Sequence, residues 1–276
     1  MNIERKIALV TGGSSGIGLA VARELALRGA RLILAARGEE RLQRAVESLP
    51  RNEARNHHYF SVDVSDFAQV QKMVDWIVEQ VGVPDILVNA AGAAHPGYIQ
   101  ELNLSIFRWM MEVNYFGTVN VVKAFLPAMI ERASGTIVNI GSLASEFGLI
   151  GYTAYCGSKF ALRGFTDALR MELKPLGIQV MLVLPPDTDT PQLEYENRYK
   201  PLELKYLFPE LGVIPPEKVA HSVIRGLQRG HYHILPDLGS QLLFMGSRLT
   251  GNLQYPVLDF LLSRAKRRIE KFKLAA

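Results

Sequence analysis

Cysteine is nearly absent from this chain, since Cys156 is the only one among 276 residues. A single thiol cannot form an intrachain disulfide, which excludes a small secreted domain held by disulfides and favours a reducing compartment. Long apolar runs are absent as well, because no charge-free stretch reaches the roughly 20 residues that a membrane-spanning helix needs. The N-terminus has no apolar signal-peptide region. We therefore expect a cytoplasmic protein.

An excess of charge of one sign is also missing, because 31 basic and 27 acidic side chains leave a net charge of +4. So small a surplus, without a recognised reading motif, does not indicate a nucleic-acid partner. The six histidines lack the spacing of a metal site, so we expect no metal. Hydrophobic residues make up 48% of the chain and charged residues 21%, which indicates a globular protein.

Short apolar runs alternate with segments of helical periodicity along most of the chain. Strands that are wholly apolar are typical of a parallel sheet covered by helices on both faces. The order therefore predicts an α/β fold, a Rossmann-like doubly wound parallel sheet. The predicted strands are residues 7–10, 32–35, 58–62, 86–88, 137–140, 180–184 and 231–235. The predicted helices are residues 17–28, 39–49, 66–81 and 155–173, and one that begins at residue 216.

No linker interrupts this series, so we expect one domain over residues 1–276. The regularity lapses between residues 185 and 216, where prolines and aromatic residues are concentrated. A connection of that length predicts a partly helical substrate lid at about residues 186–215.

A glycine-rich loop, residues 11–18, follows the first predicted strand. Gly12, Gly16 and Gly18 would let the backbone approach a pyrophosphate, and the next helix would offer its free N–H groups to the phosphates. An ordinary strand-to-helix turn is the simpler alternative. The same residues also fit the Gly-x-Ser-x-Gly turn of hydrolases. That alternative is disfavoured, because its oxyanion hole needs an earlier strand and none exists.

Ala36 and Arg37 follow the second predicted strand. A partner for a ribose diol would be an acidic residue near this point, about 20 residues beyond the glycines, and none is present. Arg37 could instead pair with a 2′-phosphate through its planar guanidinium, which favours NADPH over NADH.

Tyr155 and Lys159 lie four residues apart at the start of a predicted helix, hence on one face. An ammonium beside a phenol lowers the tyrosine pKa toward working pH. Ser142 follows a predicted strand at the edge where an open α/β sheet presents its ligand-binding groups. Its hydroxyl could hold a substrate oxygen.

The glycine loop, the serine after a strand and the Tyr-x-x-x-Lys pair follow one another along the chain. In this order they resemble the motifs of the short-chain dehydrogenases/reductases, and the resemblance covers nearly the whole length. Asn114, Ser142, Tyr155 and Lys159 match the family's catalytic residues. The resemblance implies that Tyr155 donates a proton and that Ser142 holds the carbonyl. It also implies that Lys159 binds the nicotinamide ribose while tuning Tyr155, and that Asn114 supports a water relay.

The same resemblance extends to cofactor contacts. Asn89-Ala90-Ala91-Gly92 is similar to the family's Asn-Asn-Ala-Gly element, and Asp63-Val64 matches the pair beside the adenine. Thr190 fills the family's threonine position after the sixth strand, although Pro186 replaces a common glycine. The cofactor-binding residues predicted from the loop and from the resemblance are Gly12, Ser14, Ser15, Gly16, Ile17, Gly18, Arg37, Asp63, Val64, Asn89, Ala90, Gly92, Tyr155, Lys159, Pro185, Thr188 and Thr190.

Residues 185–191 resemble one branch of this family, the 3-ketodihydrosphingosine reductases, as do Glu196-Asn197 and residues 200–203. That likeness implies NADPH-dependent reduction of a long-chain ketone at a membrane surface. A 3-oxoacyl thioester reductase and a hydroxysteroid dehydrogenase are alternatives. A catalytically silent nucleotide-binding sensor is an alternative from another class, disfavoured because binding alone needs no matched tyrosine and lysine. We also expect a homo-oligomer, a dimer or a tetramer.

The C-terminal segment, residues 238–276, combines apolar and basic residues. Such a helix could lie on an anionic membrane as a peripheral contact, or it could pack on its own domain or on a second copy. The apolar residues at helical spacing are Leu258, Leu262, Ala265, Ile269 and Phe272. The basic residues among them are Arg264, Lys266, Arg267, Arg268, Lys271 and Lys273.

Overall fold

One parallel sheet of seven strands organises the chain, in the order β3-β2-β1-β4-β5-β6-β7. The computed structural model describes residues 1–50, 56–207 and 212–275, without the side chains of residues 205 and 271–275. All neighbouring strands pair in parallel, which confirms the predicted Rossmann-like fold. The strands are β1 (Ile7–Thr11), β2 (Arg31–Ala36), β3 (His58–Ser61), β4 (Ile86–Asn89), β5 (Gly135–Ile140), β6 (Ile178–Val183) and β7 (His233–Ile234).

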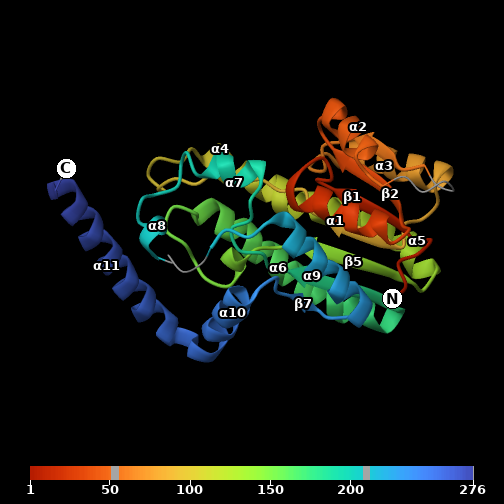
Figure 1. Cartoon of the computed structure of the whole chain (residues 1–276). Helices are drawn as coiled ribbons and strands as arrows, with labels where there is room; N and C mark the ends of the chain where they lie inside the picture. Colours follow the sequence, from red (N-terminus) through yellow and green to blue (C-terminus); the bar gives the residue numbers. More distant parts are fainter. Residues whose placement is uncertain (51–55, 208–211, 276) are drawn as a thin grey trace.

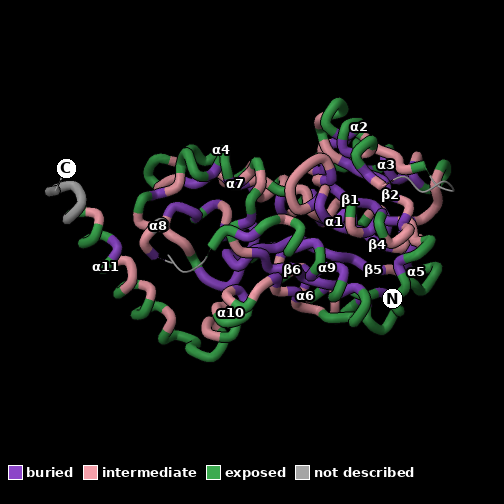
Figure 2. The backbone as a smooth tube through the Cα atoms, viewed as in Figure 1, coloured by how far each residue is buried: buried purple, intermediate pink, exposed green. Residues whose placement is uncertain are grey.

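Helices cover both faces of this sheet (Figure 1). They are α1 (Gly16–Leu27), α2 (Glu39–Glu47), α3 (Phe67–Gln80), α5 (Gly117–Glu131), α6 (Thr153–Leu173) and α9 (Pro216–Arg229). On one face, Leu25 of α1 and Val223 of α9 share a buried cluster. On the other face, Phe125 of α5 and Leu169 of α6 share a second one. The central strands between the two clusters are buried, as Figure 2 shows, which explains why most of their side chains are apolar.

Between β4 and β5 the chain forms a long helical segment that is not among the predicted helices. It runs through α4 (Leu104–Met111), a π-helical turn (Glu112–Phe116) and α5. A π-turn widens the helix by one residue and shifts side chains out of the regular register. Here it holds the buried Asn114, whose Oδ1 accepts the Ala93 N–H at 2.7 Å in the loop after β4.

The connection between β6 and α9 is partly helical, as predicted, with α7 (Pro191–Glu196) and α8 (Leu204–Leu207). Thr190 caps α7, because its Oγ1 accepts the Leu193 N–H at 3.2 Å. Thr188 pairs with Ile214 in an isolated bridge at the base of the connection. Residues 208–211 of the predicted lid lie outside the described residues.

Two helices, α10 (Leu238–Thr250) and α11 (Gln254–Ala275), end the chain. Figure 1 shows α11 extending away from the sheet. It contacts α8 where the Arg268 guanidinium lies 5.3 Å from the Tyr206 ring centroid. Ala265, three residues before Arg268 in the same helix, is buried. Within the described ranges, no helix combines the length and the apolar character needed to cross a bilayer. Short 3₁₀ turns lie at Leu143–Ser145, Lys174–Leu176 and Gly251–Leu253.

Candidate active site

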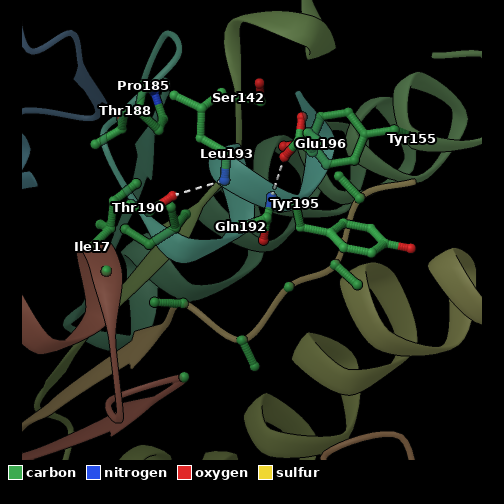
Figure 3. A pocket seen from close by; sticks show the side chains of 18 of the residues that line it. Ile17, Ser142, Tyr155, Pro185, Thr188, Thr190, Gln192, Leu193, Tyr195 and Glu196 are labelled. Atoms are coloured by element: carbon green, nitrogen blue, oxygen red, sulfur yellow. Dashed lines mark hydrogen bonds between the residues drawn. The ribbon is translucent and has the colours of Figure 1, made fainter. Parts of the chain in front are cut away.

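A cavity of about 890 Å³ opens at the carboxyl ends of the central strands. The strand order reverses between β1 and β4, the place where open α/β sheets bind ligands. All but two of the predicted site residues line this cavity. These are Gly12, Ser14, Ser15, Gly16, Ile17, Gly18, Arg37, Asp63, Val64, Ala90, Gly92, Ser142, Tyr155, Lys159, Pro185, Thr188 and Thr190. Figure 3 shows how several of them face one another.

The glycine loop packs closely against the backbone around it. Gly12 has φ +65°, and a Cβ there would stand 2.6 Å from the Ala90 carbonyl oxygen. A Cβ on Gly18 would stand 2.4 Å from the Gly12 oxygen, so only glycine allows the loop to lie this close to α1. Ser15, the N-cap of α1, makes no side-chain cap hydrogen bond. The first N–H groups of α1 are therefore placed to receive a pyrophosphate.

Two guanidinium groups mark the end of the cavity beside β2. Arg37 was predicted there, and Arg41, four residues further into α2, lines the cavity as well. No ion pair among the described residues involves either arginine. Both charges are therefore available to an anionic ligand.

Asn89 and Asn114 do not line the cavity but lie behind it. Asn89 donates to Asn139 Oδ1 at 2.9 Å, and Asn139 donates to Thr166 Oγ1 at 2.9 Å. This buried chain ties the ends of β4 and β5 to α6. Since α6 carries Tyr155 and Lys159, Asn89 shapes the site through the backbone rather than through an exposed side chain.

Ser142 and Tyr155 form the centre of the site. The Ser142 Oγ accepts the Ala144 N–H at 3.1 Å, which fixes its position at the end of β5. Its hydroxyl hydrogen-bonds Tyr155, which lowers the Tyr155 pKa, although burial and then the charge of Glu196 raise that pKa more. Tyr155 is consequently protonated at neutral pH, as a proton donor must be.

Lys159 lies on the same face of α6, with its Nζ 5.7 Å from the Tyr155 ring centroid. The Nζ donates to the Ile140 carbonyl oxygen at 2.9 Å. Asn114 anchors the neighbouring turn, because its Nδ2 donates to Ser158 Oγ at 2.8 Å. Burial lowers the Lys159 pKa from 10.5 to about 8, against an opposing effect of the Glu196 charge. The ammonium is therefore held at an energetic cost.

This cost predicts that Lys159→Met stabilises the fold. Below pH 8 the folded and unfolded chains are both protonated at Lys159, so the full burial cost is present. Between pH 8 and 10.5 only the unfolded chain binds the proton, and the cost falls as pH rises. At pH 7 the free energy of unfolding should therefore rise by about 1–3 kcal/mol, in urea titrations without cofactor. The gain should shrink toward pH 10.

The matched control for this prediction is Lys123→Met, since Lys123 is exposed on α5. That variant should leave the unfolding free energy nearly unchanged at every pH. A less stable Lys159→Met protein at pH 7 would contradict the burial cost assigned to the ammonium.

A buried carboxylic acid, Glu196, faces the same cavity from the end of α7. The Tyr152 hydroxyl donates to Oε2 at 2.6 Å, and Gln192 Nε2 donates to Oε1 at 2.9 Å. Burial raises the Glu196 pKa, while these two hydrogen bonds lower it. The sequence contains Glu196 in its distinctive segment, but nothing in its spacing assigns a role to it.

Comparison with known proteins identifies the family. Residues 6–200 match the family described as short chain dehydrogenase. The chain belongs to this family. It is an oxidoreductase that acts on C=O and CH–OH groups, and membership supports a nicotinamide cofactor.

The relatives of this short-chain dehydrogenase include sphingolipid enzymes. A 3-dehydrosphinganine reductase from Danio rerio is 44% identical over 228 residues, 81% of this chain and 69% of the relative. A 3-ketodihydrosphingosine reductase from Bos taurus is 39% identical over 247 residues, 88% of this chain and 74% of the relative. The resemblance to this branch of the family is confirmed.

Solved structures agree on the fold. A short-chain dehydrogenase/reductase from Burkholderia phymatum in complex with NAD has a TM-score of 0.81 at 26% identity, over 92% of this chain and 96% of that one. An alcohol dehydrogenase from Thermococcus sibiricus, complexed with 5-hydroxy-NADP, has a TM-score of 0.73 at 27% identity, over 84% of this chain and 96% of that one.

Proposed function

We propose that this short-chain dehydrogenase reduces 3-ketodihydrosphingosine to dihydrosphingosine with NADPH. The observation that carries the proposal is the identity of 39–44% with reductases of that name over most of the chain. The cavity adds support, because Ser142, Tyr155 and Lys159 meet in it beside the glycine loop.

In the proposed mechanism, the carbonyl oxygen binds between the hydroxyls of Ser142 and Tyr155. When bound, NADPH supplies the hydride that the ketone carbon accepts. Tyr155 gives its proton to the oxygen, while Ser142 holds the oxygen in place. Lys159 stabilises the phenolate that Tyr155 leaves and binds the ribose, and Asn114 supports the water relay that restores the proton.

Arg37 and Arg41 support NADPH rather than NADH. A guanidinium can hold a 2′-phosphate by two hydrogen bonds, and the acidic partner of a ribose diol is missing after β2. Gly12 to Gly18 would hold the pyrophosphate, with Asp63 and Val64 beside the adenine. Pro185, Thr188 and Thr190 would border the nicotinamide end.

The lipid end of the substrate has an apolar route to this site. Phe147, Leu149, Leu204 and Leu243 line the cavity, and Leu243 belongs to α10. We propose that residues 1–276 act as one domain. The β6–α9 connection would form the lid over the hydrocarbon chain of the bound substrate. An acyl chain could then pass from the apolar surface of α10 into the cavity.

Oxidation of NADPH, followed by absorbance, tests the substrate. The panel contains 3-ketodihydrosphingosine, an acetoacetyl thioester and a ketosteroid, so the two alternative substrate classes are included. The sphingoid ketone should give the highest kcat/KM. A higher value for the thioester or the steroid would replace the proposal, and turnover of none would favour the nucleotide-binding sensor.

We also propose a peripheral membrane contact through the turn between α10 and α11. The predicted apolar face of α11 is partly covered in the structure, at Leu258, Leu262, Ala265 and Ile269. Exposed apolar side chains occur instead along α10, in the turn after it and in the first two turns of α11. They are Leu242, Met245, Leu249, Leu253, Val257 and Phe260. The exposed Arg264, Lys266 and Arg267 follow, and such a combination suits an anionic lipid surface.

Flotation with phosphatidylserine vesicles at low salt measures this contact. Leu249 is 82% exposed and Phe260 64%, so Leu249→Glu with Phe260→Glu should weaken vesicle binding at least about tenfold. Met171→Glu is the control, because Met171 is 75% exposed and belongs to α6. If the intact protein ignores these vesicles, α10 and α11 are better explained as a contact between protein surfaces.

A further inference from the structure

Glu196 is a buried carboxylate that the proposed hydride and proton transfers do not use. Only 7% of the residue is exposed, yet it lines the cavity that holds the reacting groups. Figure 3 shows Glu196 and Tyr155 pointing into the same part of that cavity. The placement needs an explanation, because burying a carboxylate is costly unless a partner compensates the charge.

Neutral groups supply both side-chain hydrogen bonds that the described residues give this carboxylate. The donors are the Tyr152 hydroxyl and the Gln192 amide. Lys200, whose charge also acts on Glu196, forms its ion pair with Asp187 at 2.6 Å. A carboxylate has about four acceptor sites, so Glu196 can accept further donors. Its position is fixed, while no ion pair with a described residue neutralises its charge.

The carboxylate lies close to the point of reaction. Its charge raises the pKa of both Tyr155 and Lys159. The Tyr152 ring, whose hydroxyl binds Glu196, has its centroid 5.7 Å from that of Tyr155. If the substrate carbonyl oxygen binds at the Tyr155 hydroxyl, a group on the adjacent carbon falls beside Glu196.

We propose that Glu196 determines substrate specificity by binding the ammonium group on the carbon next to the ketone. This inference rests on the proposed function, because 3-ketodihydrosphingosine carries an amino group at that carbon. The ammonium would supply the missing cation and form a charge-assisted hydrogen bond with the carboxylate. A 3-oxoacyl thioester and a ketosteroid lack this amine, so they would leave the buried charge unpaired.

The test compares two ketones of equal chain length, 3-ketodihydrosphingosine and its analogue without the amino group. The wild-type enzyme should prefer the amine in kcat/KM by roughly 10- to 100-fold, the effect of a charge-assisted hydrogen bond. In Glu196→Gln the ratio of the two kcat/KM values should fall to near unity, because the amine loses its partner whereas the deaminated ketone has no amine to bind. Equilibrium binding of dihydrosphingosine, which retains the amine, should weaken by the same factor.

Glu194→Gln is the matched control. Glu194 lies on the same helix, but its side chain is 76% exposed and pairs with Arg198 on the surface. This variant should keep both the preference and the affinity. If Glu196→Gln does not fold, Tyr152→Phe removes one donor from the carboxylate, and it should reduce the preference without abolishing it.

The outcomes separate this inference from the function on which it rests. If the wild-type enzyme reduces the amine and its deaminated analogue equally well, the assignment of Glu196 is wrong. It is also wrong if Glu196→Gln slows both ketones by the same factor, which is the behaviour of a residue that only holds α7 in place. If the wild-type enzyme reduces neither ketone but accepts a thioester or steroid, the proposed function itself fails.

Discussion

Replacing Tyr155 by phenylalanine should lower kcat by roughly 10²- to 10⁴-fold, the usual contribution of a positioned proton donor. The change removes only the hydroxyl that Ser142 contacts. The phenylalanine ring can still pack against Tyr152, so the cavity should keep its shape. Affinity for NADPH, measured by fluorescence titration, should therefore stay close to that of the wild-type enzyme.

Tyr115→Phe provides a control for this prediction. Tyr115 lies in the π-helical turn, where its ring packs against Phe116 and Phe165. Loss of its hydroxyl should leave kcat unchanged. If Tyr155→Phe retained most of its turnover, another group would be the proton donor, and the assigned chemistry would be wrong.

Replacing Arg37 by alanine should raise the Kd for NADPH by roughly 10- to 100-fold, because a charge-assisted hydrogen bond to the 2′-phosphate is lost. The Kd for NADH should hardly change, since NADH has no phosphate at that position. Arg41 lines the same end of the cavity, so the double variant should lose more discrimination than either single variant. Parallel titrations with the two cofactors measure the ratio.

Arg44→Ala, in α2, is the control for this prediction. Arg44 is exposed, its Nε donates to the Glu40 carbonyl oxygen at 3.3 Å, and it does not line the cavity. Its loss should leave the ratio of the two dissociation constants as it was. Equal losses of NADPH and NADH affinity in Arg37→Ala would mean that Arg37 does not discriminate between the cofactors.

The sheet could be predicted from the sequence because its strands are buried on both faces. A segment such as residues 86–88 is apolar on both faces, and it forms part of β4. Tyr155 and Lys159 could be paired from their spacing alone, since residues four apart on a helix share a face. The predicted homo-oligomer stays a prediction.

Other features depend on tertiary packing, which sequence periodicity does not contain. The π-helical turn breaks the 3.6-residue repeat at Asn114, so the helical segment around it was missed. Arg41 and Glu196 reach the cavity only because of how α2 and α7 are placed. For the apolar face of α11, the sequence left membrane contact and packing on protein as alternatives, and part of this helix contacts α8.

The most direct test of the central claim is the fate of the hydride. Purified enzyme is incubated with 3-ketodihydrosphingosine and NADPH that carries deuterium at the transferable position, and the product is analysed by mass spectrometry. The account predicts dihydrosphingosine that is heavier by a single deuterium, bound to the carbon that was the ketone. Unlabelled dihydrosphingosine, or deuterium at any other carbon, would contradict it.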